Sequence, residues 1–423
     1  MNRVPRHTQA RPRALAIALA ALCIAHSASA QRPAERWVAT WTTSMIGALP
    51  YPYAGAGNDS GLVLTGRTLR QIVRVSAGGT RVRLRVSNEY GLRPLIISAT
   101  RVALSKGRTT IDTTRDRRIT FNGHSSVTIR AGANMVSDPV SLTVPDNADL
   151  AISFYFADTT RGTTLHFAAH QRNYRSVAGN LTAAADFVAD TITERWHFVT
   201  GVDVVNPRVT GVIVAFGNSI TDGTATTTDA NTRWPNILAT RLMASREPPK
   251  AVVNAGIGGN QVTSPLRGPS ALQRFDRDVL MQPGVTHVIV LEGVNDISRG
   301  TGTRDPRDDV SAAELIAAHA QLVQRAHERG LVILGGTLTP VGGMNGLTPE
   351  HIAKRDALNA WIRTSGVYDG VIDFDRITRD PADTSRFLPA YDSGDHLHPN
   401  DAGYRAMGDA IHLGLFRKRP LRR

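Results

Sequence analysis

Cysteine is almost absent from this sequence of 423 residues, because Cys23 is the only one. A single cysteine forms no internal disulfide and supplies no cluster of thiolate metal ligands. Long apolar runs are scarce too. The run over residues 14–25 is shorter than the ~20 residues of a membrane span, and no later stretch approaches that length. These absences exclude a disulfide-rich scaffold, and they predict a chain without a transmembrane segment.

The N-terminus has the pattern of a secretory signal peptide over residues 1–30. Arginines precede the apolar run, and Ala28-Ser29-Ala30 supplies the small residues of a cleavage site. We expect cleavage after Ala30, which removes Cys23, and export to the periplasm or the extracellular space. A lipoprotein signal needs a small residue before the cysteine, whereas Leu22 stands there.

Positive charge exceeds negative charge, with a formal net charge of +13. Four of these charges lie in the predicted signal peptide and five in the tail 417–423, so the body carries about +4. Such an excess attracts anionic polysaccharide, a membrane surface or nucleic acid, or it simply marks a solvated tail. No nucleic-acid-binding motif accompanies the charge. The sequence therefore favours the solvated tail and predicts no nucleic-acid partner.

Short alternating runs fill the first half of the chain, from residue 37 to about residue 199. Residues 81–87, RVRLRVS, alternate strictly between charged or polar and apolar side chains. Further runs lie at 71–76, 126–129, 140–144 and 150–156, with Gly, Asn and Pro between them. Period-two runs separated by turn signals indicate antiparallel sheets with one buried face each. We predict a jelly-roll-like β-sandwich domain over residues 31–205.

The second half alternates buried strands with helices. Apolar runs suited to strands lie at 212–216, 251–254, 287–291, 331–334 and 370–374. Helical stretches lie at 234–243, 271–280, 312–329 and 349–362, and residues 402–416 suit a closing helix. This alternation predicts an α/β domain, in which helices wrap a parallel sheet. We place the boundary near Asn206-Pro207, the α/β domain over 206–416 and a basic tail over 417–423.

The segment 212–223, VIVAFGNSITDG, carries the candidate nucleophile, Ser219. A β-branched apolar run ends there in a serine close to glycines, which indicates a strand, a tight turn and a helix. Such a turn exposes a nucleophile above the sheet of an α/β protein. The alternative is that Ser219 only caps the following helix, because serine is a favoured N-cap residue.

A nucleophilic serine needs a base and a group that orients this base. Asp395 and His398 stand three residues apart, and a turn or a first helical turn brings both side chains to one face. The carboxylate can then hold one ring nitrogen of His398 while the other faces Ser219. His396 is a rival base, whose side chain points away if the segment is helical, and Asp392 is a weaker rival to Asp395.

Three donors are candidates for an oxyanion hole. They are the backbone N–H of Ser219, the backbone N–H of Gly259 and the side-chain amide of Asn295. Asn295 follows the apolar run 287–291 and so belongs at the carboxyl edge of the sheet, where open α/β sheets bind ligands. The alternatives are an ordinary glycine loop at Gly259 and a helix cap at Asn295.

The sequence gives little support for a nucleotide site or a metal site. The segment 256–259, GIGG, does not extend to a dinucleotide motif, because residue 261 is Gln, and no Gly-Lys-Ser or Gly-Lys-Thr follows. His396 and His398 could chelate a metal as a pair, but few other ligands lie nearby in the sequence. We therefore predict no cofactor and no metal.

Four sequence words together resemble the conserved blocks of the SGNH (GDSL-type) hydrolase family: GNSITDG at 217–223, NAGIGGN at 254–260, EGVND at 292–296 and DHLHPND at 395–401. This resemblance covers about residues 210–410. It implies a flavodoxin-like three-layer fold, Ser–His–Asp catalysis and no cofactor. Asn218 departs from the family pattern, in which Asp usually precedes the serine. An amide still accepts a hydrogen bond and also donates one, so we expect Asn218 to brace the turn.

The first half also resembles a known module. WVATW at 37–41 and TLRQIVR at 68–74 are similar to segments of the β-rich module that precedes the SGNH domain in one secreted bacterial subgroup. That subgroup includes enzymes similar to xylan and other carbohydrate esterases. We therefore expect a secreted serine esterase that removes O-acetyl or other short acyl groups from polysaccharide.

Two alternatives stay open. One is a lipid or aryl esterase with the same mechanism. The other belongs to a different class, a glycan-binding protein whose hydrolase half is an inactive scaffold. The sequence leaves the oligomeric state open.

Overall fold

The computed structural model describes residues 1, 35–47, 62–265, 267–298 and 309–417. Residues 36–423 form one compact unit, in which we distinguish a β-rich region, residues 36–205, from an α/β region, residues 206–417. Apart from Met1, the predicted signal peptide with Cys23 lies outside the described residues, and so does the predicted tail beyond Arg417. Among the described helices, none combines the length and apolar character of a membrane span.

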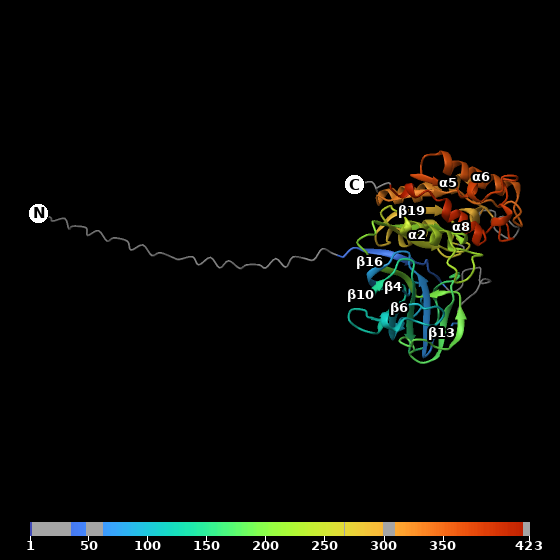
Figure 1. Ribbon diagram of the computed structural model, residues 1–423. Coiled ribbons are helices and arrows are strands. Elements are labelled where there is room, and N and C mark those ends of the chain that lie inside the picture. The colour runs from blue at the N-terminus through green and yellow to red at the C-terminus, as the bar shows by residue number, and fades with distance from the viewer. Residues whose placement is uncertain (2–34, 48–61, 266, 299–308, 418–423) are drawn as a thin grey trace. The chain divides into compact units, whose positions relative to one another are not determined.

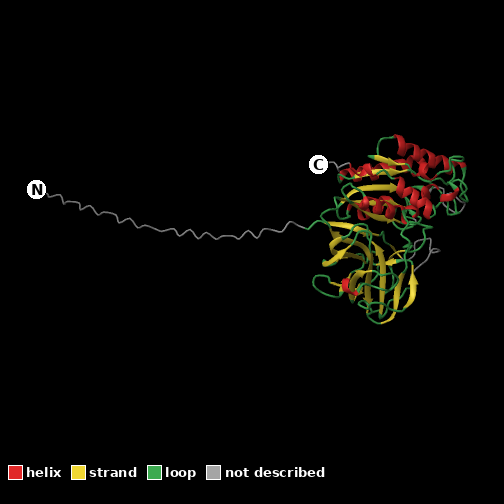
Figure 2. Cartoon of the chain, in the orientation of Figure 1, coloured by secondary structure: helices red, strands yellow, loops and turns green. Residues whose placement is uncertain are grey.

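The β-rich region is built from antiparallel sheets (Figure 2). One sheet has the order β1-β16-β4-β10 with β9 beside β4, and another has the order β14-β13-β3-β11-β6-β7. Two smaller sheets have the orders β15-β12-β2 and β5-β8. The bounds are β1 Trp37–Thr42, β2 Ile46–Gly47, β3 Arg67–Arg74, β4 Gly79–Ser87, β5 Leu95–Ile97, β6 Ala99–Leu104, β7 Arg117–Ile119, β8 Val127–Ile129, β9 Asn134–Val136, β10 Val140–Val144, β11 Asp149–Phe156, β12 Thr164–His166, β13 Asn173–Ala178, β14 Ala189–Thr193, β15 Trp196–His197 and β16 Val199–Val205.

Strand β4 illustrates why the alternating pattern folds this way. Val82, Leu84 and Val86 are buried, whereas the arginines between them are more exposed. One face of the strand thus enters the core and the other stays polar. The predicted antiparallel β-rich half is confirmed, and its jelly-roll arrangement stays a prediction.

The α/β region holds a parallel sheet in the order β18-β17-β19-β20-β21. Numbered along the chain, these strands run 2-1-3-4-5, which is the order of flavodoxin-like sheets. The bounds are β17 Gly211–Gly217, β18 Lys250–Gly256, β19 Val285–Leu291, β20 Val332–Gly336 and β21 Gly370–Ile372. All seven residues of β17 are buried, as expected for an inner strand covered on both faces. The predicted parallel sheet is confirmed.

Helices lie on both faces of this sheet, with α5 and α6 packed together on one side and α2 and α8 packed together on the other (Figure 1). Capping boxes start α5, at Ser311 and Glu314, and α6, at Thr348 and His351. The bounds are α1 Ser219–Asp222, α2 Trp234–Ala244, α3 Ala271–Phe275, α4 Val294–Ile297, α5 Ala312–Glu328, α6 Pro349–Thr364, α7 Phe374–Thr378 and α8 Asp401–Ala410, with a π-helix at Asp276–Leu280 and 3-10 turns at Thr113–Arg115, Pro389–Tyr391 and Leu413–Arg417.

Two predicted elements are shorter than expected. The predicted helix 402–416 ends at Ala410, because Ile411 adopts an extended conformation, buries its side chain and lets Arg241 donate to the Gly408 and Ile411 carbonyls. The predicted strand 370–374 ends at Ile372, because Asp373 caps α7 by accepting the Arg376 N–H.

The two regions are joined at the edge of the parallel sheet that β18 forms. Thr42 Oγ1, at the end of β1, donates to the Asn254 carbonyl over 3.0 Å. The Val252 N–H donates to Ser76 Oγ over 3.1 Å, and one apolar core cluster contains residues from both regions. The β-rich region therefore packs beside the strand that leads into the loop carrying Gly259.

Candidate active site

Ser219 lies at the turn between β17 and α1, as the sequence predicts. It is the first residue of α1, and Asn218 caps this helix by accepting the Ile220 N–H. A Cβ atom at Gly217 would come within 2.2 Å of Thr221 Oγ1 and 2.6 Å of the Leu291 carbonyl oxygen, so the turn closes only with glycine there. The N–H of Ser219 belongs to the first turn of a helix, where backbone donors have no partner within the helix.

The structure brings the predicted nucleophile, base and carboxylate together. His398 Nε2 lies 2.8 Å from Ser219 Oγ, and His398 Nδ1 lies 2.6 Å from Asp395 Oδ2. Because an ionised carboxylate only accepts, Nδ1 carries the proton and Nε2 offers its lone pair to the serine hydroxyl. The three groups form the arrangement that activates a serine nucleophile.

Asp395 is held in its ionised form by its surroundings. Its Oδ1 accepts the backbone N–H groups of Leu397 and His398 and the hydroxyl of Ser393. Partial burial alone would raise the pKa of Asp395, but the hydrogen bonds from His398 and the backbone outweigh it and lower this pKa to about 2. The carboxylate therefore stays charged across the neutral range and can balance an imidazolium at His398.

The rival histidine, His396, bonds to the rival carboxylate, Asp392. His396 Nδ1 is 2.5 Å from Asp392 Oδ2, and its side chain is 41% exposed. His396 has a φ of +62°, and the segment 392–399 is a turn closed by a bridge between Asp392 and Pro399 rather than a helix. Each histidine thus bonds to a different aspartate. Backbone N–H groups that donate to Asp392 and Asp395 fix this arrangement, and helical periodicity does not.

Gly259 and Asn295 lie on connected segments at the carboxyl ends of β18 and β19. Asn295, on α4, donates from Nδ2 to the Asn260 carbonyl over 2.8 Å, and Gln261 Nε2 donates to the Asn295 carbonyl over 2.8 Å. An amide nitrogen carries two hydrogens, so Asn295 keeps a second donor. Gly259 has a φ of +74°, and a Cβ atom there would lie 2.7 Å from Arg267 Cγ, which explains the glycine at this position.

Asn218 braces the nucleophile turn from inside the protein. Its Oδ1 accepts the Ile220 N–H over 3.1 Å, and its Nδ2 donates to Glu292 Oε2 over 3.2 Å. Glu292 is fully buried, and burial raises its pKa to about 8 although Arg274 Nη2 lies 3.3 Å away. The amide donates to this carboxyl group, which a carboxylate at position 218 could not do.

Sequence reasoning assigned no role to three further residues around the nucleophile helix. His166 of the β-rich region lies 2.9 Å from Asp222 Oδ1 through Nε2. Arg233 is buried and donates from Nε to the Asp222 carbonyl over 2.7 Å and from Nη2 to the Ala169 carbonyl. Glu292 belongs to the EGVND word, but His166 carries no sequence signal, since its partner Asp222 lies 56 residues away in the other region.

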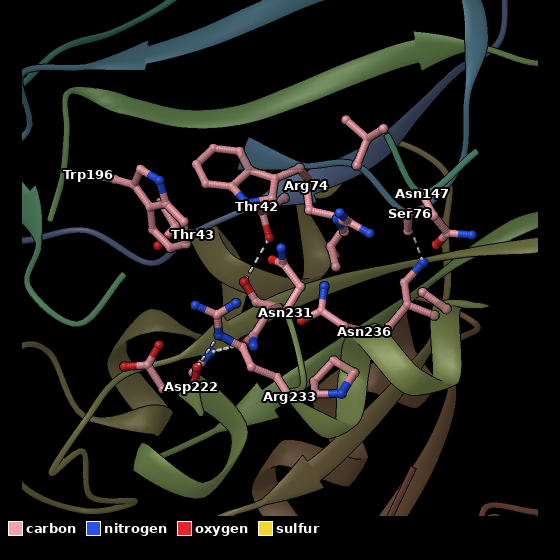
Figure 3. A pocket seen from close by; sticks show the side chains of 18 residues that line it. Thr42, Thr43, Arg74, Ser76, Asn147, Trp196, Asp222, Asn231, Arg233 and Asn236 are labelled. Atoms are coloured by element: carbon pink, nitrogen blue, oxygen red, sulfur yellow. Dashed lines mark hydrogen bonds between the residues drawn. The ribbon is translucent and has the colours of Figure 1, made fainter. Parts of the chain in front are cut away.

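A pocket with both polar and apolar lining borders Asp222 where the two regions meet. Figure 3 shows Asp222 and Trp196 at one end of it and Ser76 and Asn147 at the other, with Asn231 between them. Amide, hydroxyl and guanidinium groups lie in its lining together with apolar side chains such as Trp41 and Pro235. The described residues contain no group of three His, Cys, Asp or Glu side chains placed to hold a metal ion.

Comparisons with known proteins find a family match for part of the chain. Residues 215–406 match the sequence model of the GDSL-like lipase/acylhydrolase family. No curated protein matches the chain.

Several solved structures are similar to about half of the chain. One is a GDSL-like lipase from Bacteroides thetaiotaomicron, with 19% identity over 49% of this chain and 88% of that chain and a TM-score of 0.37. The native aryl esterase of M. smegmatis has 16% identity over 47% of this chain and 95% of that chain, with a TM-score of 0.37. An acetyl xylan esterase, AlAXEase, has 19% identity over 47% of this chain and 96% of that chain, with a TM-score of 0.34.

Proposed function

Because residues 215–406 belong to the GDSL-like lipase/acylhydrolase family and the chain is thus an ester hydrolase, we propose that Ser219 is its nucleophile. In this proposal His398 is the general base, and Asp395 orients it. The observation that carries the proposal is the 2.8 Å distance between Ser219 Oγ and His398 Nε2. Proton transfer along this hydrogen bond needs no movement of either side chain.

The reaction then proceeds in two halves. His398 Nε2 takes the hydroxyl proton as Ser219 Oγ attacks the ester carbonyl, and Asp395 stabilises the imidazolium that forms. The N–H groups of Ser219 and Gly259 and the second Nδ2 hydrogen of Asn295 bind the developing oxyanion. His398 returns the proton to the leaving alcohol, and a water molecule, activated by the same base, hydrolyses the acyl-enzyme at Ser219.

For the substrate, we propose O-acetyl or other short acyl groups on polysaccharide, acted on outside the cytoplasm. The predicted signal peptide over residues 1–30 supports this choice. So does the resemblance of segments 37–41 and 68–74 to the β-rich module of a secreted subgroup that includes enzymes similar to carbohydrate esterases. A lipid or aryl esterase of the same mechanism is the competing substrate class. A preference for long-chain over acetyl esters would favour that class.

The test is hydrolysis of 4-nitrophenyl acetate and of acetylated xylan by the mature protein, with Ser219→Ala as the comparison. We expect the variant to lose at least about 10³-fold in kcat, since the nucleophile is removed. Full activity of Ser219→Ala would disprove the mechanism. Activity on 4-nitrophenyl acetate without acetate release from acetylated xylan would remove the polysaccharide assignment and keep the mechanism.

A further inference from the structure

His166 is a residue of the β-rich region that reaches the nucleophile helix. It ends β12, and it is only 1% exposed. Its Nδ1 lies 2.9 Å from the Ser44 carbonyl oxygen, and its Nε2 lies 2.9 Å from Asp222 Oδ1. A carbonyl oxygen and a carboxylate only accept, so both ring nitrogens must donate and the ring is an imidazolium. Burial lowers the pKa of His166, but the charge and the hydrogen bond of Asp222 raise it above its ordinary value.

Asp222 connects this imidazolium to the loop that carries Gly259. It ends α1, one helical turn after Ser219, and is 3% exposed. While Oδ1 faces His166, Oδ2 accepts the Gly258 N–H over 3.1 Å. One carboxylate therefore joins the β-rich region, the nucleophile helix and the residue that directly precedes Gly259.

The same loop has a second anchor on the other side of Gly259. The Asn260 carbonyl accepts a hydrogen bond from Asn295 Nδ2 over 2.8 Å. Gly259 thus lies between a residue held by Asp222 and a residue held by Asn295. An oxyanion donor acts only when it is held at hydrogen-bond distance from the developing charge, and a displacement of about 1 Å can cost about 100-fold in rate.

We propose that His166 is a positioning residue of the esterase: it holds the Asp222 carboxylate, which holds the Gly258 N–H and so fixes the Gly259 N–H for the oxyanion. This inference rests on the proposed role of Gly259. It makes the β-rich region a part of the active site, because the residue that secures the oxyanion loop comes from that region.

The other groups around His166 keep one charge state at working pH. His166 is therefore the group whose titration changes the contact with Asp222. Arg233 contacts the backbone carbonyl of Asp222, not its carboxylate. Burial lowers the pKa of His170, nearby, to about 4, so His170 is neutral at working pH. Burial also raises the pKa of Tyr404, close to Asp222, well above its ordinary value. The ring neighbours, Phe167 and Trp196, do not titrate.

The sign of the pH effect follows from the raised pKa of His166. Below that pKa the imidazolium holds Asp222, and as the pH rises through it the ring loses a donor and the contact weakens. The kcat of the unmodified protein should therefore fall on the alkaline side. This fall is a readout that a purely structural role at position 166 would not produce.

The experiment measures kcat and KM for 4-nitrophenyl acetate between pH 6 and pH 10 on the full mature chain. The variants are His166→Gln, which cannot supply two opposed ring donors, and His124→Gln, an exposed histidine of the same region, as the matched control. At pH 7 we expect His166→Gln to lose about 10- to 100-fold in kcat, with KM changed less than about threefold. Its alkaline fall in kcat should disappear, while the control keeps the profile of the unmodified protein.

Asp222→Asn provides a second route to the same test. It keeps an oxygen for the Gly258 N–H but removes the charge that the imidazolium balances, so it too should lose the alkaline fall. The double variant should lose no more kcat than the more impaired single variant, since both act through one loop. Circular dichroism shows whether His166→Gln folds. If it does not, Asp222→Asn alone tests the inference.

Each outcome supports or overturns the inference. An unchanged kcat and an unchanged alkaline fall in His166→Gln, together with an inactive Ser219→Ala, would overturn it and leave the proposed function standing. Asp222→Asn with the alkaline fall of the unmodified protein would also overturn it. Full activity of Ser219→Ala would remove the proposed function itself.

Discussion

Two carboxyl groups flank the nucleophile turn, and their surroundings move their pKa values in opposite directions. Asp395 is half exposed and accepts hydrogen bonds from a ring, a hydroxyl and two backbone N–H groups, which bring its pKa to about 2. Glu292 is fully buried beside Arg274 and the Asn218 amide, and its pKa is about 8. Several donors at the surface thus outweigh burial at Asp395, whereas a cation, the Asn218 amide and the Gly293 backbone N–H do not outweigh it at Glu292.

The difference separates the roles of the two groups. A carboxyl group that stays ionised can orient and balance a histidine, whereas one that keeps its proton near neutral pH acts as a hydrogen-bond donor or an acid. Asp395 therefore belongs to the proposed catalytic triad, and Glu292 supports Asn218 and the turn. Replacing each carboxyl group by its amide tests this division.

The largest effect is expected from Asp395→Asn. The amide no longer stabilises the imidazolium at His398, and it permits the wrong ring tautomer, so kcat for 4-nitrophenyl acetate should fall by about 10³- to 10⁴-fold. The matched control is Asp392→Asn, which removes the carboxylate from the rival pair with His396. Its kcat should stay within about threefold of the unmodified protein. Equal losses in the two variants would contradict the assignment of Asp395.

Glu292→Gln should change stability rather than catalysis. Because the folded protein keeps the Glu292 proton up to about pH 8 and the unfolded chain loses it near its ordinary value of 4.5, this group makes the folded state less stable as the pH rises between these values. The slope is at most about 1.4 kcal/mol per pH unit. Urea unfolding at pH 5, 6.5 and 8 measures this effect. The free energy of unfolding of Glu292→Gln should increase relative to that of the unmodified protein as the pH rises. Parallel stability curves would show that Glu292 is not protonated when buried.

Asn218→Asp introduces the residue that usually precedes the serine in the SGNH family that this segment resembles, and it places a second carboxylate against Glu292. While Glu292 is protonated it can donate its proton to the new carboxylate, whereas once it ionises the two charges repel each other in a buried place. We expect a loss of about 1–3 kcal/mol in the free energy of unfolding at pH 9, and a smaller loss at pH 6. The same loss at both pH values would mean that the two groups do not interact.

The parallel sheet and the residues at the ends of its strands could be predicted from the sequence. Buried apolar runs predicted the parallel sheet, and Ser219, Gly259 and Asn295 follow the carboxyl ends of three of its strands. Parallel strands end at one edge, so the pattern alone predicts that these residues share it. Asp395 and His398 stand only three residues apart, and this short spacing likewise predicts their contact.

Contacts between the two regions could not be predicted in this way. His166 lies in a short strand whose sequence has no special feature, and only the packing of β12 beside α1 brings it to Asp222. The end of α8 at Ala410 was missed for a related reason, because the burial of Ile411 and the contact with Arg241 are tertiary. The spacing of apolar residues indicates which face of a helix or strand is buried. It does not indicate which distant side chain contacts that face.

The smallest effect concerns the contribution of Asp395 to stability in acid, which has the opposite sign to that of Glu292. The pKa of Asp395 is about 2 in the folded protein, against an ordinary 3.8, so its stabilisation is present above about pH 4 and is lost as the pH falls toward 2. The side chain is 50% exposed, and solvent screening therefore holds the contribution below about 1 kcal/mol. Urea unfolding of Asp395→Asn and the unmodified protein should differ at pH 5 and converge near pH 2. If the difference in the free energy of unfolding persists at pH 2, the charge of Asp395 is not its cause. The stabilisation would then come from the shape of the turn, which the amide and the protonated acid would not maintain equally.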